Sequence, residues 1–170
     1  MKIFKKVLVF LLVILIVIQF IRPTKNVSTA QSKNNIAQVY AVPANVNTIM
    51  EKACYDCHSN NTRYPWYSRL QPVAWWLNDH IKEGKRELNF DDFKSYSPRK
   101  QYNKLNEVIE QVKEGEMPLT SYTIVHTNAK LSDEEKNSLM NWADDIRKSM
   151  ETKYPMDSLL RKKRETPKGA

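Results

Sequence analysis

Both cysteines of this 170-residue chain lie in one short stretch, CYDCHSN, at residues 54–60, together with one of its three histidines. The chain has no other cysteine with which either thiol could form a bridge or share a metal ion. A disulfide between Cys54 and Cys57 would close a very small loop and would therefore constrain the unfolded chain little. A structural zinc site takes four ligands, and only His80 and His126 remain outside this stretch.

The C-x-x-C-H spacing favours another interpretation, covalent attachment of a c-type haem. A thioredoxin-like redox pair is expected after a strand in a βαβ unit, whereas the residues before Cys54 follow a helical pattern. Two thiols three residues apart on one helical turn can each bond to one haem vinyl group, and His58 then lies under the ring as proximal iron ligand. Tyr55 and Asp56, which separate the cysteines, are expected on the surface of the turn. We therefore predict one covalent haem c held by Cys54, Cys57 and His58.

The first 21 residues are typical of a signal sequence, with three lysines before an apolar run at residues 7–21. The run would span about 22 Å as a helix, against about 30 Å of hydrocarbon, but extending it toward the chain start makes a span feasible. We predict an uncleaved signal anchor at residues 1–21, with cleavage near Ala30 as the alternative. The positive-inside rule then puts the haem domain on the periplasmic side of the bacterial cytoplasmic membrane.

The formal net charge of +8 is located at the two ends of the chain. Residues 1–30 carry +5 and residues 151–170 carry +3, whereas residues 31–150 hold sixteen basic and sixteen acidic side chains. We therefore expect no nucleic-acid partner and interpret residues 151–170 as a basic C-terminal tail. Only three glycines occur, which excludes a glycine-rich phosphate loop.

Four segments with helical periodicity follow a polar stretch at residues 22–42, which we interpret as a linker. They cover residues 44–58, 72–84, 98–115 and a segment that begins with a capping box at Ser132. In the second segment Gly84 is expected to end the helix. The inner stripe of that helix would consist of Val73, Trp76, Leu77, His80 and Ile81. Apart from a short candidate strand at residues 122–125 no alternating pattern occurs, so we predict an all-α fold of about four helices.

The iron of such a haem has a second face, opposite His58, for which the sequence offers alternatives. Met117 is followed by Pro118, which prevents a continuing helix, and an irregular stretch can aim a thioether at the iron. A methionine that fills a gap in the core is the competing interpretation. His126 is the alternative distal ligand, whereas His80 on an apolar helix face is more typical of a core residue. An open iron face is a further alternative.

The two haem propionates also need partners. Arg63 and Trp66 lie in NTRYPWYSR, just after the cysteine motif. We predict that both bind the cofactor, because arginine pairs with carboxylates and an indole donates a hydrogen bond. The competing interpretation makes Arg63 a surface charge and Trp66 a core side chain.

Three blocks, CYDCHSNNTRYPWYSRLQPVAWWL, GEMPLTSY and HTNAKLS, resemble the bacterial haem-binding domain family, over roughly residues 40–148. Its members are short membrane-anchored proteins related in plan to monohaem c-type cytochromes. The resemblance implies a small cytochrome c-like helical domain at residues 43–150, wrapped around a haem that both cysteines bind, with His58 as proximal ligand. The order of the motifs is also similar to class I cytochrome c, which supports Met117 as distal ligand.

These features predict an electron carrier that exchanges electrons with redox partner proteins of the membrane or periplasm. An iron held by both His58 and Met117 leaves no site for a substrate, so an enzyme is not the first expectation. The alternatives are a peroxidase-like haem enzyme and a haem-based ligand sensor. The enzyme would need an open or labile iron face and an acid–base group such as His126 or His80.

Overall fold

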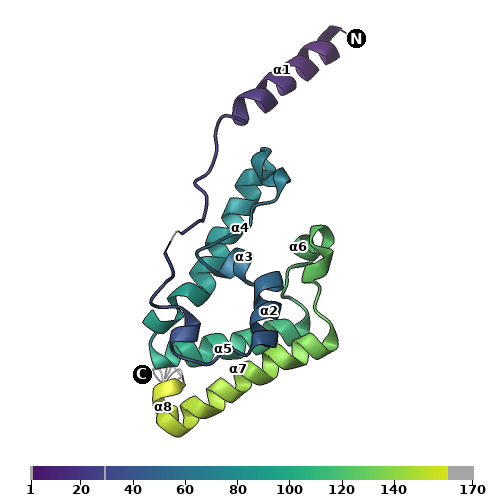
Figure 1. The fold of residues 1–170 in the computed structure, drawn as a ribbon. Helices are drawn as coiled ribbons and strands as arrows, with labels where there is room; N and C mark the ends of the chain where they lie inside the picture. Colours follow the sequence, from purple (N-terminus) through teal and green to yellow (C-terminus); the bar gives the residue numbers. More distant parts are fainter. Residues whose placement is uncertain (1, 29, 161–170) are drawn as a thin grey trace, which may run out of the picture.

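The computed structural model describes residues 2–28 and 30–160, and every regular element in these ranges is helical (Figure 1). The prediction of an all-α fold is therefore confirmed, although the described ranges hold eight α-helices where about four were expected. The α-helices are α1 (Lys2–Ile18), α2 (Ala44–Ala53), α3 (Tyr55–His58), α4 (Val73–Glu87), α5 (Pro98–Glu114), α6 (Thr120–Val125), α7 (Asp133–Lys153) and α8 (Met156–Leu159). Short 3-10 helices connect them: η1 (Ile36–Gln38), η2 (Trp66–Arg69), η3 (Phe90–Ser95) and η4 (Thr127–Ala129).

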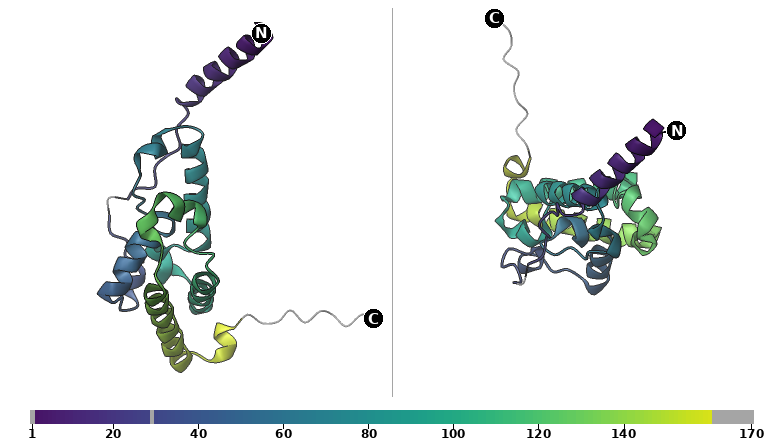
Figure 2. Two further views of the ribbon diagram at one scale, coloured as in Figure 1. Left: turned by 90° about the vertical axis from the view of Figure 1, so that its right-hand side faces the viewer. Right: turned by 90° about the horizontal axis from the view of Figure 1, so that it is seen from above.

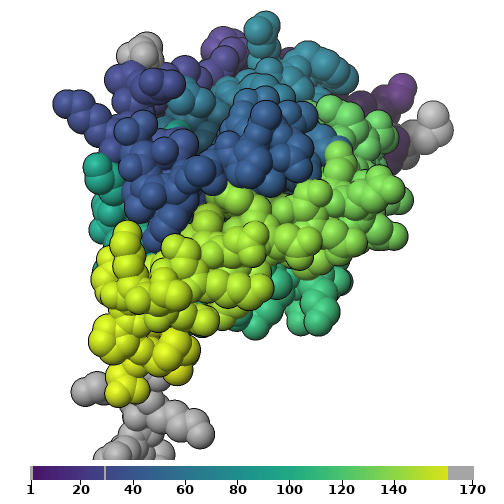
Figure 3. All heavy atoms as spheres, turned by 60° about the horizontal axis from the view of Figure 1, so that its bottom comes forward, coloured from purple at the N-terminus to yellow at the C-terminus, as the bar shows by residue number. Residues whose placement is uncertain are grey.

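The hydrophobic core is built on α5 and α7, which lie side by side in Figure 1. They run antiparallel, because Tyr102 near the start of α5 donates a 2.7 Å hydrogen bond to Glu151 near the end of α7. Helix α2 packs against α7, and Figure 3 shows the face on which the two lie beside each other. The buried side chains shared by these three helices include Val46, Ile49, Met50, Leu105, Val112, Leu139, Trp142 and Ile146.

The ends of α5 and α7 follow the signals in the sequence. The Ser97 side chain caps α5 ahead of Pro98, and Gly115 ends the helix with a left-handed φ of 78°, a conformation that favours glycine. Ser132 and Glu135 form the predicted capping box at the start of α7. Local capping chemistry therefore determines where these two helices begin and where α5 ends.

Helix α4 differs from its prediction in two respects. It continues through Gly84 to Glu87, and it buries Ala74 and Ile81, whereas the expected inner residues Val73 and Trp76 are exposed. The first difference arises from the close approach of α4 to the cysteine motif. A Cβ atom at Gly84 would lie 2.9 Å from the carbonyl oxygen of Cys57, which is too close. Gly84 is therefore a packing position and not a helix stop.

The candidate strand at residues 122–125 is also wrong, because these residues belong to α6. The last ten residues of the expected tail, 161–170, lie outside the described part of the chain. The preceding ones do not form an extended end: α7 continues to Lys153, and Leu159 of α8 is fully buried.

Helix α1 projects away from the rest of the molecule (Figures 1 and 2). It ends at Ile18, where the Gln19 side chain turns to the backbone of Gln71, accepting from its N–H at 3.0 Å. Over residues 2–28 and 30–160, no helix combines the length and the apolar character that crossing a bilayer requires. The predicted single N-terminal span, on which the expected location at the cytoplasmic membrane rested, is therefore wrong.

Much of the expected linker at residues 22–42 packs on the helical body. The Asn26 side chain donates 2.9 Å hydrogen bonds to the Ser59 carbonyl and to the Thr62 hydroxyl, and it accepts one from Lys85 at 2.6 Å. Farther along, Ile36 of η1 is fully buried in the core cluster. These contacts attach the segment next to the cysteine motif.

Candidate functional site

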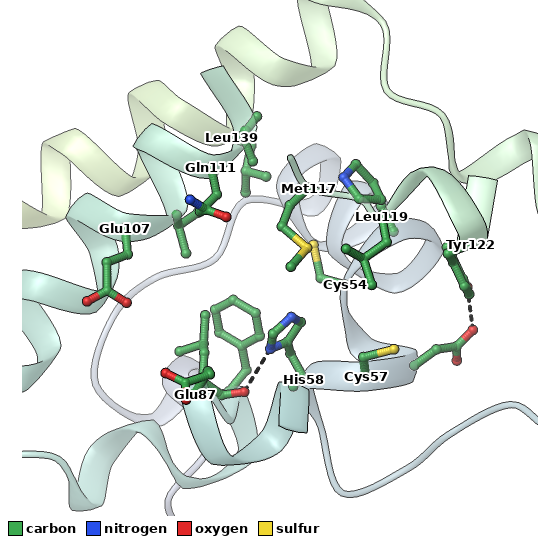
Figure 4. Close-up of a pocket in the computed structure, with 18 of the residues that line it drawn as sticks. Cys54, Cys57, His58, Glu87, Glu107, Gln111, Met117, Leu119, Tyr122 and Leu139 are labelled. Carbon is green, nitrogen blue, oxygen red and sulfur yellow. Dashed lines mark hydrogen bonds between the residues drawn. The ribbon is translucent and has the colours of Figure 1, made fainter. Parts of the chain in front are cut away.

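A cavity of about 540 Å³ lies between the cysteine motif and the segment after α5 (Figure 4). Its walls come from α3, α4, α5 and α6, and from residues 117–119. The apolar part of the lining includes Leu88, Phe90, Val108, Val112, Leu131 and Leu139. A cavity of this size and lining is typical of a site for a largely apolar small molecule or cofactor.

The cysteine motif forms one wall of this pocket. Helix α2 ends at Ala53, and α3 turns at once so that Cys54, Cys57 and His58 all line the cavity. The His58 N–H donates to the Cys54 carbonyl at 2.9 Å, which closes one helical turn around the motif. Three chemically active side chains are thus presented to the same space by a four-residue helix and the residue that precedes it.

The imidazole of His58 is held in one tautomer. Its Nδ1 lies 2.9 Å from the carbonyl oxygen of Leu88, the residue that follows α4. Because a carbonyl can only accept, Nδ1 carries the proton and Nε2 keeps its lone pair for a ligand bond. Burial also lowers the pKa of His58, which favours the neutral ring that binds metals. His58 is therefore prepared as a nitrogen donor.

The two cysteines are unpaired thiols. Burial raises the pKa of Cys54 to about 12 and that of Cys57 to about 11, so both stay protonated near neutral pH. A reactive redox pair needs a thiol with a lowered pKa, and a structural zinc site needs four ligands. In addition, no group of three His, Cys, Asp or Glu residues that could hold a metal ion occurs in the described ranges. The geometry thus gives no support to these two interpretations of the motif.

Met117 enters the pocket from the other side. Gly115 turns the chain at the end of α5, and the N–H of Met117 bonds to the Gln111 carbonyl at 3.1 Å. In Figure 4 the thioether of Met117 comes from the upper side of the pocket and the imidazole of His58 from the lower side. The structure therefore brings both predicted iron ligands to one cavity.

Arg63 and Trp66, by contrast, do not line this pocket. Arg63 pairs with Asp56, its Nε lying 3.0 Å from the carboxylate, and Trp66 is 76% exposed. Trp66 is therefore not the core side chain of the competing interpretation, and the role of both residues in cofactor binding stays a prediction. Asp56 itself is only 7% exposed, so its expected place on the surface is wrong.

Of the two remaining histidines, His80 lines the main pocket and His126 does not. His126 Nε2 lies 2.6 Å from the Tyr67 hydroxyl, and the ring lines a second cavity of about 270 Å³. The Nδ1 of His80 is 2.9 Å from the Trp76 carbonyl, and its ring lies 4.2 Å from the Trp76 indole. His126 as distal ligand stays a prediction that would require its side chain to move.

One end of the pocket is charged, which the sequence patterns did not indicate. Lys104 of α5 lines it with Glu87 and Glu107, and its Nζ lies 2.5 Å from Glu107 and 3.5 Å from Glu87. The Lys104–Glu107 spacing is visible in the sequence but resembles an ordinary exposed helix pair. Only the fold shows that the Lys104 side chain is 14% exposed and faces the cavity.

Comparisons with known proteins agree with this pocket. The model of a family described as haem-binding domain matches residues 13–145, which is more than half of the chain. The chain is also 28% identical over 119 residues to a cytochrome c peroxidase, Ccp, of Escherichia coli (strain K12). That match covers 66% of this chain and 25% of the peroxidase, so this chain spans about a quarter of its relative's length. No solved structure matches. The family match shows that this chain belongs to the haem-binding domain family.

Proposed function

We propose that this protein holds one haem c covalently and acts as an electron carrier. The observation that carries the proposal is a convergence: the cysteine motif at residues 54–58 and Met117, distant in sequence, line the same apolar cavity. The donors fit the group, because they supply two thiols, one imidazole with a free Nε2 and one thioether. Other uses of paired cysteines need thiolates or further ligands that this pocket does not offer.

Each side chain has a separate task in this proposal. Cys54 and Cys57 supply the two thioether bonds, and His58 binds the iron through Nε2 while the Leu88 carbonyl orients its ring. The apolar lining excludes water from the metal. A haem in this environment supplies one-electron redox chemistry.

Met117 would be the second side chain that holds the iron. Thioether ligation raises the reduction potential relative to two histidines, and occupation of both iron faces leaves no open position for a substrate. These properties suit exchange of electrons with protein redox partners, which we propose as the partners of this chain.

The attachment is tested on the matured protein. We expect intact-mass measurement to show one added macrocycle, and acidified acetone to leave the colour with the protein. The Cys54→Ala/Cys57→Ala variant should release its haem under the same treatment, because no thioether bond remains. A wild-type protein that loses its haem to the solvent contradicts covalent attachment.

The distal ligand is tested by optical spectroscopy of the oxidised protein. The weak long-wavelength sulfur-to-iron charge-transfer band should be present in the wild type and absent in Met117→Ala. Met140→Ala is the matched control, because this methionine packs against the core and does not line the pocket. If the spectrum of the iron changes in His126→Ala and does not change in Met117→Ala, His126 is the distal ligand instead.

A peroxidase-like enzyme is the second candidate, favoured by the similarity to the cytochrome c peroxidase of Escherichia coli. In that case the Met117 thioether would leave the iron readily, and His80, which lines the pocket, is a candidate for the acid–base group. Rapid binding of cyanide by the wild type, together with peroxide turnover that Met117→Ala does not increase, would favour this enzyme over the carrier.

A further inference from the structure

The segment that carries Met117 is fixed firmly at its start and sparsely beyond it. At the start, Gly115 caps α5, and the N–H groups of Glu116 and Met117 bond to the Gln111 carbonyl at 3.0 and 3.1 Å. Within the described part of the chain, two hydrogen bonds join residues 118–130 to other segments: Tyr122 to Asp56, and His126 to Tyr67. Helix α6 also exposes Ile124 and Val125, so it has little apolar packing to hold it.

The bond between Tyr122 and Asp56 has an unusual position. The Tyr122 hydroxyl donates to Asp56 Oδ2 at 2.6 Å, and Asp56 lies between the two cysteines (Figure 4). Both residues line the main pocket and also the second cavity, so the pair forms part of the wall between them. The bond therefore joins the segment after Met117 directly to the turn that carries Cys54, Cys57 and His58.

The acceptor is itself held rigidly. Arg63 donates to Asp56 Oδ1 from its backbone N–H and from Nε, both at 3.0 Å, while Thr62 donates to the Asp56 carbonyl at 2.6 Å. A tyrosine bonded to so well-placed a carboxylate gains an interaction stronger than a neutral hydrogen bond. On the other side, the Tyr122 ring stacks on His126 with centroids 4.3 Å apart.

We propose that Tyr122 and Asp56 are positioning residues for the distal side: their hydrogen bond keeps the Met117 segment (residues 117–126) closed over the pocket and sets how easily a small ligand displaces the thioether. The inference rests on the proposed role of Met117 as distal ligand. Neither residue touches the iron in this scheme, and both act through Met117.

Hydrogen exchange on the full chain tests the first part of the proposal, that the bond keeps the Met117 segment closed. Tyr122→Phe keeps the ring and removes only the hydroxyl, so the amides of residues 117–126 should exchange about tenfold faster or more. Tyr40→Phe is the matched control, because it also removes one hydroxyl bond, the 2.7 Å bond to Gln101, away from the pocket. Equal exchange of residues 117–126 in both variants overturns the proposal.

Imidazole binding to the oxidised, haem-loaded protein tests the second part, that the bond sets how easily a ligand displaces the thioether. Tyr122→Phe should bind imidazole about tenfold more tightly and Tyr40→Phe as the wild type does. In the Met117→Ala background Tyr122→Phe should add nothing, because Tyr122 acts only through Met117. An equal effect of Tyr122→Phe with and without Met117 overturns this indirect role. If Tyr122→Phe speeds exchange but Met117→Ala binds imidazole as the wild type does, the positioning bond is supported and Met117 is not the iron ligand. Failure of the positioning bond and failure of the ligand assignment therefore give different results.

Discussion

The two sides of this molecule are stabilised differently. On the side formed by α2, α5 and α7, the apolar faces meet one another, and α7 alone buries five residues: Leu139, Trp142, Ala143, Ile146 and Met150. On the side formed by α3, α4 and α6, the described residues of α6 include no buried one, and Asp56 is the buried residue of α3. These helices surround a cavity: α4 packs closely on α3 at Gly84, and α6 is joined to α3 by the bond between Tyr122 and Asp56. The pocket side is therefore the part that gains most from an occupant.

The largest expected effect contrasts the same substitution on the two sides. Leu105→Ala should lower the free energy of unfolding by about 2–5 kcal/mol, because Leu105 is 1% exposed in the closed core. Leu119→Ala, in the pocket lining, should lower it by about 1 kcal/mol or less in the haem-free chain, because no close-packed contacts are lost. Denaturant unfolding followed by circular dichroism measures both. Equal losses would mean that the two sides are packed alike.

A smaller effect is expected where α4 packs against the cysteine motif. Gly84→Ala places a methyl group against the backbone of Cys57 and should destabilise the protein by about 1–3 kcal/mol. It should also reduce the fraction of chains that carry haem, because the motif turn is displaced. Lys82→Ala, on an exposed position of the same helix, is the control. Normal haem loading in Gly84→Ala would show that α4 can shift without disturbing the turn.

A pH effect is expected at the ion pair that joins α2 to α7. The Lys52 ammonium, 2.5 Å from the carboxylate, lowers the pKa of Glu135 below its ordinary value of 4.5. A depressed pKa stabilises the fold above pH 4.5, and this stabilisation is lost as the pH falls through the lower, folded-state pKa. Glu135→Gln should therefore remove about 0.5 kcal/mol at neutral pH, a loss that shrinks in acid and in high salt. Glu134→Gln, at an exposed neighbouring position, should show little change, and identical pH profiles would contradict the pair.

The smallest effect is expected at Trp66. Because its indole is 76% exposed, Trp66→Ala should change the free energy of unfolding by no more than about 0.5 kcal/mol. The haem absorption spectrum should also keep its position, since the side chain does not line the pocket. Loss of haem or a shifted spectrum in this variant would restore Trp66 as a cofactor-binding residue.

The elements that sequence reasoning located correctly depend on local signals. The ends of α5 and the start of α7 follow from a serine cap, a terminal glycine and a capping box, all within a few residues of the helix end. The cysteine motif and Met117 could be singled out because their chemistry is visible in the residues themselves. That they line the same pocket agrees with the resemblance to the family.

The features that were missed depend on residues far apart in the chain. Gly84 is read as a helix stop until its approach to Cys57 is known. From the sequence alone, Asp56 is an ordinary turn residue, because its bond with Tyr122, 66 positions later, is visible only in the fold. Likewise, α1 ends where Gln19 meets Gln71, 52 positions away. Periodicity contains no information about such pairs, because each member taken alone is compatible with the surface.

The burial of Asp56 inside the C-x-x-C-H turn has an evolutionary consequence. The two residues between the cysteines would be free to diverge if they only separated the thiols, but here one of them serves both Arg63 and Tyr122. We expect these three positions to coevolve among homologues, so that a relative without the acid also lacks the guanidinium and the phenol. For the same reason, a generic attachment motif grafted into this chain would carry the cysteines but not the geometry around them.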